Sequence, residues 1–278
     1  MAKALHLEGL RCDGDAHGGC QAGCLIFWKE AWLKRESESS GGRGAAIGAT
    51  EHARAGRCTE EAVLMAVTAP GERNPADLRY SCQSTRLSQA TQPLPWWDVR
   101  QYVEDFTSGN VRLSQMLAAF LFFCCHTLAT SGLGVGTAMR WSYDLFQEAR
   151  GGTPYPWRRG LIPEGMPTPV EKLNLQEGEL ARVKGYREIL RTLDSVSWRN
   201  RGLYFDAELV PFCNRTFRVL RRVQQIIEEK TGRLIKFKSD ALILNDVFCQ
   251  ARYSKCRRFC PRSIYPYWRE IWLERIGE

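Results

Sequence analysis

The last 39 residues of the chain, 240–278, repeat a pattern that already occurs in its first 35 residues. In each copy a short stretch with alternating leucines leads into three cysteines, and two tryptophans four residues apart follow. The aligned residues are Cys12, Cys20 and Cys24 with Cys249, Cys256 and Cys260, and Trp28 and Trp32 with Trp268 and Trp272. Three cysteines and two tryptophans in the same order, separated by two small gaps, indicate one module used twice.

The region around the C-terminal copy has the pattern of a small β-barrel. It contains several short runs of alternating apolar and polar residues, a hairpin turn at 229–233 and one short helical stretch. This combination predicts an SH3-like barrel. We therefore expect a mostly β fold with a helical insert, made of duplicated small SH3-like β-barrel modules with cysteine-rich loops. The N-terminal copy is expected to be truncated.

Composition divides the chain further. The predicted segments are 1–35, the truncated first cysteine-rich module; 36–98, a linker with a small α/β segment; 99–149, a helical, apolar segment; 150–175, a linker rich in proline and glycine; and 176–278, the SH3-like cysteine-rich module. The paired tryptophans of each module lie on one helical face, which favours packing in the core over an aromatic binding platform.

Four cysteines of the C-terminal module have a spacing that suits a metal site. Cys213 precedes a predicted strand, and Cys249, Cys256 and Cys260 lie in a loop that follows another. Four thiolates at tetrahedral positions bind structural zinc, and a [4Fe–4S] cluster also takes four cysteines. The sequence therefore predicts a metal site, with zinc as the cofactor and an iron–sulfur cluster as the alternative. Reduced structural thiols and a redox-active disulfide stay open.

The N-terminal copy supplies three candidate ligands, Cys12, Cys20 and Cys24. A fourth could come from Cys58, Cys82 or His17. Three cysteines with one open position would suit a catalytic metal, whereas a truncated module would hold a broken or weak site. The eleven cysteines of the chain and the lack of a signal-peptide pattern indicate a reducing, cytoplasmic location.

Residues 113–139 contain no Asp, Glu, Lys or Arg, and this length suffices for a membrane span of about 20 residues. Three glycines near the end of the stretch argue against a span. A span would also place the two cysteine modules in different compartments. A buried helix, a helix lying on the membrane surface and a true span remain alternatives.

The charge of the chain is unevenly distributed. Residues 140–278 hold 26 basic and 17 acidic residues, whereas residues 1–139 hold 13 and 14. A basic half can face nucleic acid, anionic lipid or an acidic partner, or it can simply solubilise the surface. The residues that could line one basic sheet are Arg218, Arg221, Arg222, Lys236 and Lys238.

No conventional catalytic motif is present. The sequence lacks Gly-x-Ser-x-Gly, a Walker loop, His-Glu-x-x-His and a Rossmann glycine pattern, and it has four histidines. No enzyme class is therefore predicted.

Several phrases of the sequence resemble an uncharacterised bacterial family with paired cysteine-rich, SH3-like repeats. They are HLEGLRCDGDAHGGCQAGCLIFWKEAWLK, RCTEE, PLPWWDVRQY, RGGTPYP, NRGLYFDAELVPFC and FCPRSIYPYWREIWLER. The resemblance covers nearly the whole chain. It implies the duplicated fold and a complete first barrel with a cysteine like Cys213, a feature that this sequence lacks because it begins at Ala4 of that module. It implies no activity.

Together these features predict a metal-binding scaffold protein whose small barrels are stabilised by structural zinc. We expect it to associate with a membrane and to belong to a biosynthetic complex. The alternatives are a zinc or iron–sulfur metalloenzyme and a nucleic-acid-binding basic barrel. The expected partners are another protein, the membrane surface through 113–139, or nucleic acid. The expected location is cytoplasmic, with association to the inner face of the membrane as a variant.

Overall fold

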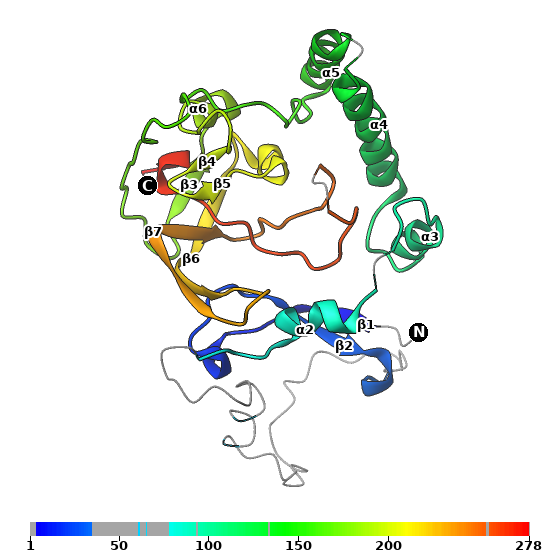
Figure 1. Ribbon diagram of the computed structural model, residues 1–278, viewed down its shortest axis with the longest axis vertical. Coiled ribbons are helices and arrows are strands. Elements are labelled where there is room, and N and C mark those ends of the chain that lie inside the picture. Colours follow the sequence, from blue (N-terminus) through cyan, green and yellow to red (C-terminus); the bar gives the residue numbers. More distant parts are fainter. Residues whose placement is uncertain are drawn as a thin grey trace. The chain divides into compact units, whose positions relative to one another are not determined.

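The computed structural model describes residues 4–34, 78–92, 94–132, 134–253 and 256–277, together with Glu61 and Met65. It contains two compact units. Unit 1 comprises residues 1–91 and 225–235, and unit 2 comprises residues 92–224 and 236–278. The fold is mixed α/β rather than mostly β, because much of residues 83–150 folds into helices (Figure 1). The five-segment division from composition stays a prediction.

Unit 1 is built on two antiparallel strands, β1 (Ala4–Arg11) and β2 (Leu25–Lys29). Leu5 pairs with Trp28, and the register shifts between His6 and Arg11. The loop between the strands carries the short 3-10 turn η1 (Asp15–His17), and η2 (Glu30–Trp32) follows β2.

The described part of unit 1 also contains a helix and a hairpin tip. Helix α2 (Gln83–Ala90) is joined to β2 by the Gln83 side chain, which bonds both the N–H and the C=O of Phe27. The tip belongs to the long strands β6 (Thr216–Ile227) and β7 (Leu234–Leu244). Gly232 in the turn has φ 74°, a conformation that glycine adopts without strain.

Unit 2 contains a curled four-stranded sheet in the order β7-β6-β3-β8. Strand β3 (Leu180–Val183) runs antiparallel to both β6 and β8 (Leu273–Arg275). An antiparallel bridge between Leu242 and Trp268 links β7 to the segment just before β8, so the sheet bends into a half-barrel. The shorter elements around it are α6 (Tyr186–Leu190), β4 (Arg199–Asn200), β5 (Leu203–Tyr204), η4 (Ala207–Phe212) and η5 (Glu270–Trp272).

The half-barrel encloses the main hydrophobic core. Alternation along β3 points Ala181 and Val183 inward, and both are fully buried. Trp268 and Trp272 are also fully buried in this core, which confirms the packing interpretation of the C-terminal tryptophan pair. Burial of large apolar side chains of this kind is the main favourable contribution to folding.

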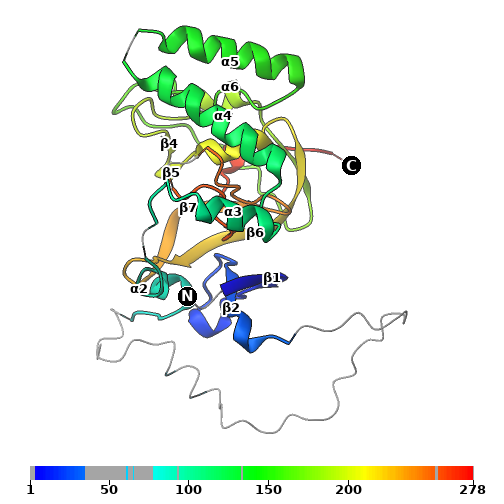
Figure 2. The same ribbon diagram turned by 90° about the vertical axis from the view of Figure 1, so that its right-hand side faces the viewer.

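Three helices complete unit 2 and lie in a row beside the strands (Figure 1). They are α3 (Arg100–Thr107), α4 (Leu113–Thr130) and α5 (Gly136–Arg150). Helices α4 and α5 contact each other and form a helical hairpin (Figure 2). α5 ends where Gly151 adopts φ 63°, a common way to terminate a helix.

Aromatic contacts hold these helices to the remainder of unit 2. Phe259, from the loop after β7, packs with Met116 and Ala119 of α4. Further along α4, Phe122 packs with Tyr143 and Tyr155. Helix α4 is long and apolar enough to cross a membrane, with a mean hydropathy of 1.5, and 22% of that window is buried inside the protein.

The two sequence copies share local backbone geometry. Leu5 pairs with Trp28 in the first copy, and the aligned Leu242 bridges to Trp268 in the second. In both copies a 3-10 turn, η2 or η5, follows at once. The side-chain environments differ, since Trp32 is 62% exposed whereas Trp272 is fully buried.

Candidate anion-binding cleft

The C-terminal cysteines do not converge on one point. Cys213 follows η4 and packs against the hydrophobic core, where burial raises the pKa of its thiol to about 12. Burial likewise raises the pKa of Cys249 to about 12, with further contributions from Glu208 and Cys256. Cys256 is exposed.

The N-terminal cysteines come closer together. Cys12, Cys20, Cys24 and Cys82 line one cavity of about 470 Å³ in unit 1, together with His17. The Cys12 Sγ lies 3.7 Å from His17 Nδ1. Burial raises the pKa of the Cys12 thiol and lowers that of the His17 imidazole. Both groups are therefore favoured in their neutral forms.

The metal-binding function predicted from these cysteines is wrong. Within the described parts of the chain, no group of three or more His, Cys, Asp or Glu side chains is placed to hold a metal ion. The zinc or iron–sulfur cofactor itself stays a prediction. Cys213 packs against the hydrophobic core, whereas Phe259, next to Cys260, packs against α4. Cys58 lies outside the described residues.

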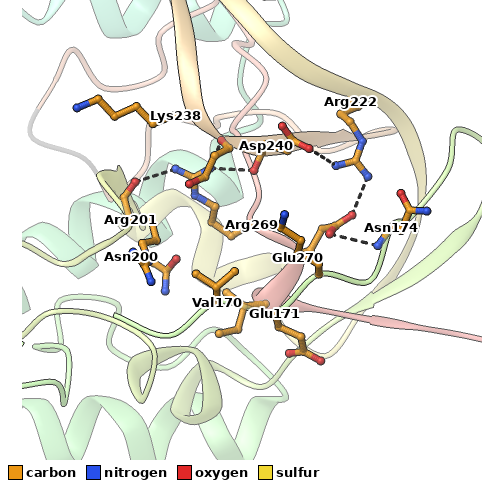
Figure 3. Close-up of a pocket in the computed structure, with 13 residues that line it drawn as sticks. Val170, Glu171, Asn174, Asn200, Arg201, Arg222, Lys238, Asp240, Arg269 and Glu270 are labelled. Carbon is orange, nitrogen blue, oxygen red and sulfur yellow. Dashed lines mark hydrogen bonds and ion pairs between the residues drawn. The ribbon is translucent and has the colours of Figure 1, made fainter. Parts of the chain in front are cut away.

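A polar cleft lies in unit 2, beside the half-barrel, and has a volume of about 380 Å³. Strands β6 and β7 supply one side, the segment 170–174 lies opposite, and the β4–β5 turn and η5 close it (Figure 3). Its polar lining residues are Glu171, Lys172, Asn174, Asn200, Arg201, Arg222, Lys238, Ser239, Asp240, Arg269 and Glu270.

Glu270 organises one end of the cleft. Its carboxylate accepts hydrogen bonds from the backbone N–H groups of Leu173, Asn174 and Leu175, at 3.0, 3.2 and 3.0 Å. Arg222 donates to it as well, at 2.8 Å. Burial alone would raise the pKa of Glu270, but these hydrogen bonds outweigh burial, so the pKa is lowered. The carboxylate therefore stays ionised and fixes the segment 173–175.

Arg222 joins the two acidic residues of this end. One Nη donates to Glu270 and the other donates to Asp240 at 3.0 Å (Figure 3). Its charge is therefore shared between two carboxylates and is already balanced. Glu171, at the edge of the cleft, is paired with Lys184 at 2.7 Å. Each acidic residue of the lining therefore already forms an ion pair.

Arg269 is a buried cation with an incomplete set of partners. It is 7% exposed, and its Nη groups donate to the carbonyl oxygens of Ser239, Asp240 and Arg201. Its Nε is buried and has no hydrogen-bond partner. No carboxylate forms an ion pair with Arg269 in the described part of the chain, and burial lowers its pKa.

Three further cations line the cleft without an ion pair among the described residues: Lys172, Arg201 and Lys238. All three side chains are exposed. With Arg222 and Arg269 the lining holds five basic residues against three acidic ones. The cleft therefore has an excess of positive charge, and it can attract and hold an anion.

The backbone at two lining positions is left-handed. Asn174 has φ 52° and Arg201 has φ 46°. Asparagine tolerates this region, but arginine in it costs about 1 kcal/mol or more. Arg201 and Gly202 form the two-residue turn between β4 and β5, where Asn-Gly is the favoured pair. A long basic side chain at a strained turn position points to a role beyond turn formation.

The sequence indicated part of this site. Arg222 and Lys238 belong to the predicted basic sheet and do line the cleft, whereas Arg218, Arg221 and Lys236 do not. Arg269 and Glu270 were missed. A signal for them exists, because both sit between two tryptophans predicted to be buried, a position where a charged pair requires polar partners.

Comparison of the sequence with known protein families and with curated proteins found no match.

Proposed function

We propose that this protein binds a small ligand with two or more oxyanion groups, phosphate or carboxylate, in the cleft of unit 2. The observation that carries the proposal is the buried, incompletely bonded Arg269 together with Lys172, Arg201 and Lys238 around the same cleft. An oxyanion accepts hydrogen bonds from arginine and lysine, and none of these four side chains forms an ion pair with a carboxylate among the described residues.

The dimensions of the cleft agree with this ligand class. A volume of about 380 Å³ lies at the lower end of the range of small-molecule sites, about 300–1,000 Å³. Hydrogen bonds between the backbone segments that carry the cations also support the proposal. Asn200, 1% exposed, bonds the carbonyl oxygens of Pro169 and Thr192 at 3.0 Å each and so ties the 170 segment to the turn that bears Arg201.

Arg201 offers a test that separates binding from folding. Asparagine suits the left-handed turn position better than arginine and carries no charge. We expect Arg201→Asn to leave unit 2 as stable as the wild type or more stable. It should weaken binding of the ligand about tenfold or more, because a charge-assisted hydrogen bond contributes about 1.5–3 kcal/mol.

The experiment is isothermal titration of the full chain with inorganic pyrophosphate and, separately, with citrate. Lys238→Ala should weaken binding, whereas Lys236→Ala serves as the matched control, because Lys236 is an exposed lysine on the same strand outside the cleft. Equal weakening by both lysine variants would indicate general attraction to a basic surface and overturn the proposal. The absence of saturable binding of both anions would also overturn it.

We also infer that the N- and C-terminal copies are two versions of one SH3-like module. The support is the shared pairing of Leu5 with Trp28 and of Leu242 with Trp268, followed in each copy by a 3-10 turn. The sequence resemblance to a family with paired repeats supports the same inference. In this view the cleft, which depends on the segment 170–174 and on β6, is a property of the C-terminal copy.

A further inference from the structure

Helix α4 exposes an apolar stripe to the outside of unit 2. Leu113, Leu117, Leu121 and Leu128 lie four, four and seven residues apart along the helix, and they are 53%, 61%, 55% and 48% exposed. This spacing places them on one side of the helix. The opposite side is buried against the rest of unit 2, so the exposed stripe is a second apolar face rather than the core face.

Helix α3 has its polar side inward. Gln101 and Asp105 are buried, whereas Val99, Val103 and Phe106 are 68%, 60% and 49% exposed. Gln101 bonds the carbonyl oxygen of Pro95, and Asp105 is paired with an arginine, so these polar contacts fix the rotation of the helix. A helix in water normally has the reverse arrangement.

Tryptophans and further apolar residues extend this exposed set. Trp96 and Trp97, just before α3, are 68% and 66% exposed, and Trp141 of α5 is 66% exposed. Leu145, one turn after Trp141, and Phe146 are also exposed. We call the exposed apolar side chains of residues 96–106, α4 and α5 the apolar surface. Tryptophan is enriched where proteins meet the boundary between lipid and water.

Arginines lie at the ends of the apolar surface, although its segments carry no net positive charge. Residues 96–150 contain four arginines and five acidic residues. Arg112 is exposed at the start of α4, and Arg150, at the end of α5, lies over the Phe146 ring at 5.1 Å. Arginines at the ends of an apolar surface can reach lipid head groups.

We propose that the apolar surface docks in the plane of a lipid bilayer, with α4 lying on the membrane and not crossing it. The other side of α4 is engaged in unit 2, where Met116 and Phe122 are buried and His126 Nδ1 lies 2.8 Å from the Tyr155 hydroxyl oxygen. A spanning helix would lose these contacts. A helix with one face in the protein and the other in the head-group region retains them.

Flotation of the purified full chain with lipid vesicles tests the proposal. Vesicles of phosphatidylcholine with phosphatidylglycerol should carry the protein to the top of the gradient, and alkaline carbonate should release it. Leu117→Glu should reduce the partition coefficient about tenfold or more, because burial of a leucine side chain contributes about 1.5–3 kcal/mol. Tryptophan emission should shift to the blue with vesicles present.

Leu161→Glu is the matched control, because Leu161 is 62% exposed, as Leu117 is at 61%, and it lies outside the apolar surface. This variant should float as the wild type does. No flotation of the wild type with anionic vesicles would overturn the proposal, as would equal loss in the two variants. Retention in the membrane after carbonate would show a span instead. A dimer that dissociates in Leu117→Glu, without vesicle binding, would show that a second copy covers the surface.

Discussion

Replacing Glu270 by glutamine removes one charge from a carboxylate that holds four donors. The Glu270 side chain is buried at 7% exposure. Its Oε2 accepts from Leu173 and Asn174, and its Oε1 accepts from Leu175 and Arg222. Glutamine has nearly the same shape but offers one acceptor oxygen and one NH2 group. In either orientation of the amide, the NH2 group faces two of the four donors.

The size of the effect follows from these two unsatisfied donors. A buried donor without a partner costs about 1–3 kcal/mol, so Glu270→Gln should lower the free energy of unfolding by about 2–6 kcal/mol. The whole stability of a domain is about 5–15 kcal/mol. With a shift of about 2–4 °C per kcal/mol in a protein of this size, the melting temperature should fall by at least about 4 °C.

Urea unfolding followed by tryptophan fluorescence measures this loss, because Trp268 and Trp272 are fully buried in the same core. Glu274→Gln is the control: it makes the same substitution four residues away. Glu274 forms an ion pair with Arg182, and the two side chains are 34% and 53% exposed. Loss of such an exposed pair should cost less than about 1 kcal/mol. If Glu270→Gln lost no more stability than Glu274→Gln, the reasoning about the buried donors would be refuted.

Three further predictions concern the same unit. Folding lowers the pKa of Glu270, so the ionised carboxylate stabilises the fold above the unfolded pKa of about 4.3, and this stabilisation is lost as the pH falls through the lower folded pKa. The free energy of unfolding should therefore fall more steeply with pH below about 4.3 in the wild type than in Glu270→Gln. Cys213→Ser should destabilise the protein by about 1–3 kcal/mol, because it buries a hydroxyl in the core, whereas exposed Cys256→Ser should change stability by less than about 0.5 kcal/mol in the same urea assay. Arg257→Ala leaves the buried Asp105 without its ion pair and should lower the free energy of unfolding by about 1–3 kcal/mol. This loss is smaller than for a fully buried pair, because Arg257 is 36% exposed. A melting temperature equal to that of the wild type would contradict this expectation.

Local patterns in the sequence predicted the strands well. The hairpin turn predicted at 229–233 lies between β6 and β7, and Gly232 adopts a positive φ in it. The sequence shows short alternating runs in this region, whereas β7 is one continuous strand from Leu234 to Leu244. Strand formation depends on residues close in sequence, and period-two alternation reports it directly.

The candidate site could not be predicted in the same way. The spacing of the cysteines shows which thiols lie close together along the chain, but the direction of each side chain is set by tertiary contacts. Cys213 points into the core, and the loop that carries Cys249 is anchored through Phe259. The cleft combines segments far apart in the chain, so spacing along the sequence holds no information on which cations meet in it. Arg269 and Glu270 therefore became recognisable through their burial and their partners.

The rotation of helix α3 shows how one polar contact can decide what a surface exposes. Asp105 accepts from Arg257 at 3.1 Å and from Asn110 at 3.0 Å, and Asn110 also donates to the carbonyl oxygen of Phe259. Turning α3 by half a turn would bury Val103, but it would also leave the Arg257 and Asn110 donors without this carboxylate. The hydrogen bonds of Asp105 with Arg257 and Asn110 thus direct Val103 outward. The exposed apolar face is therefore fixed by the internal structure of unit 2, as expected for a surface that has a low-polarity partner.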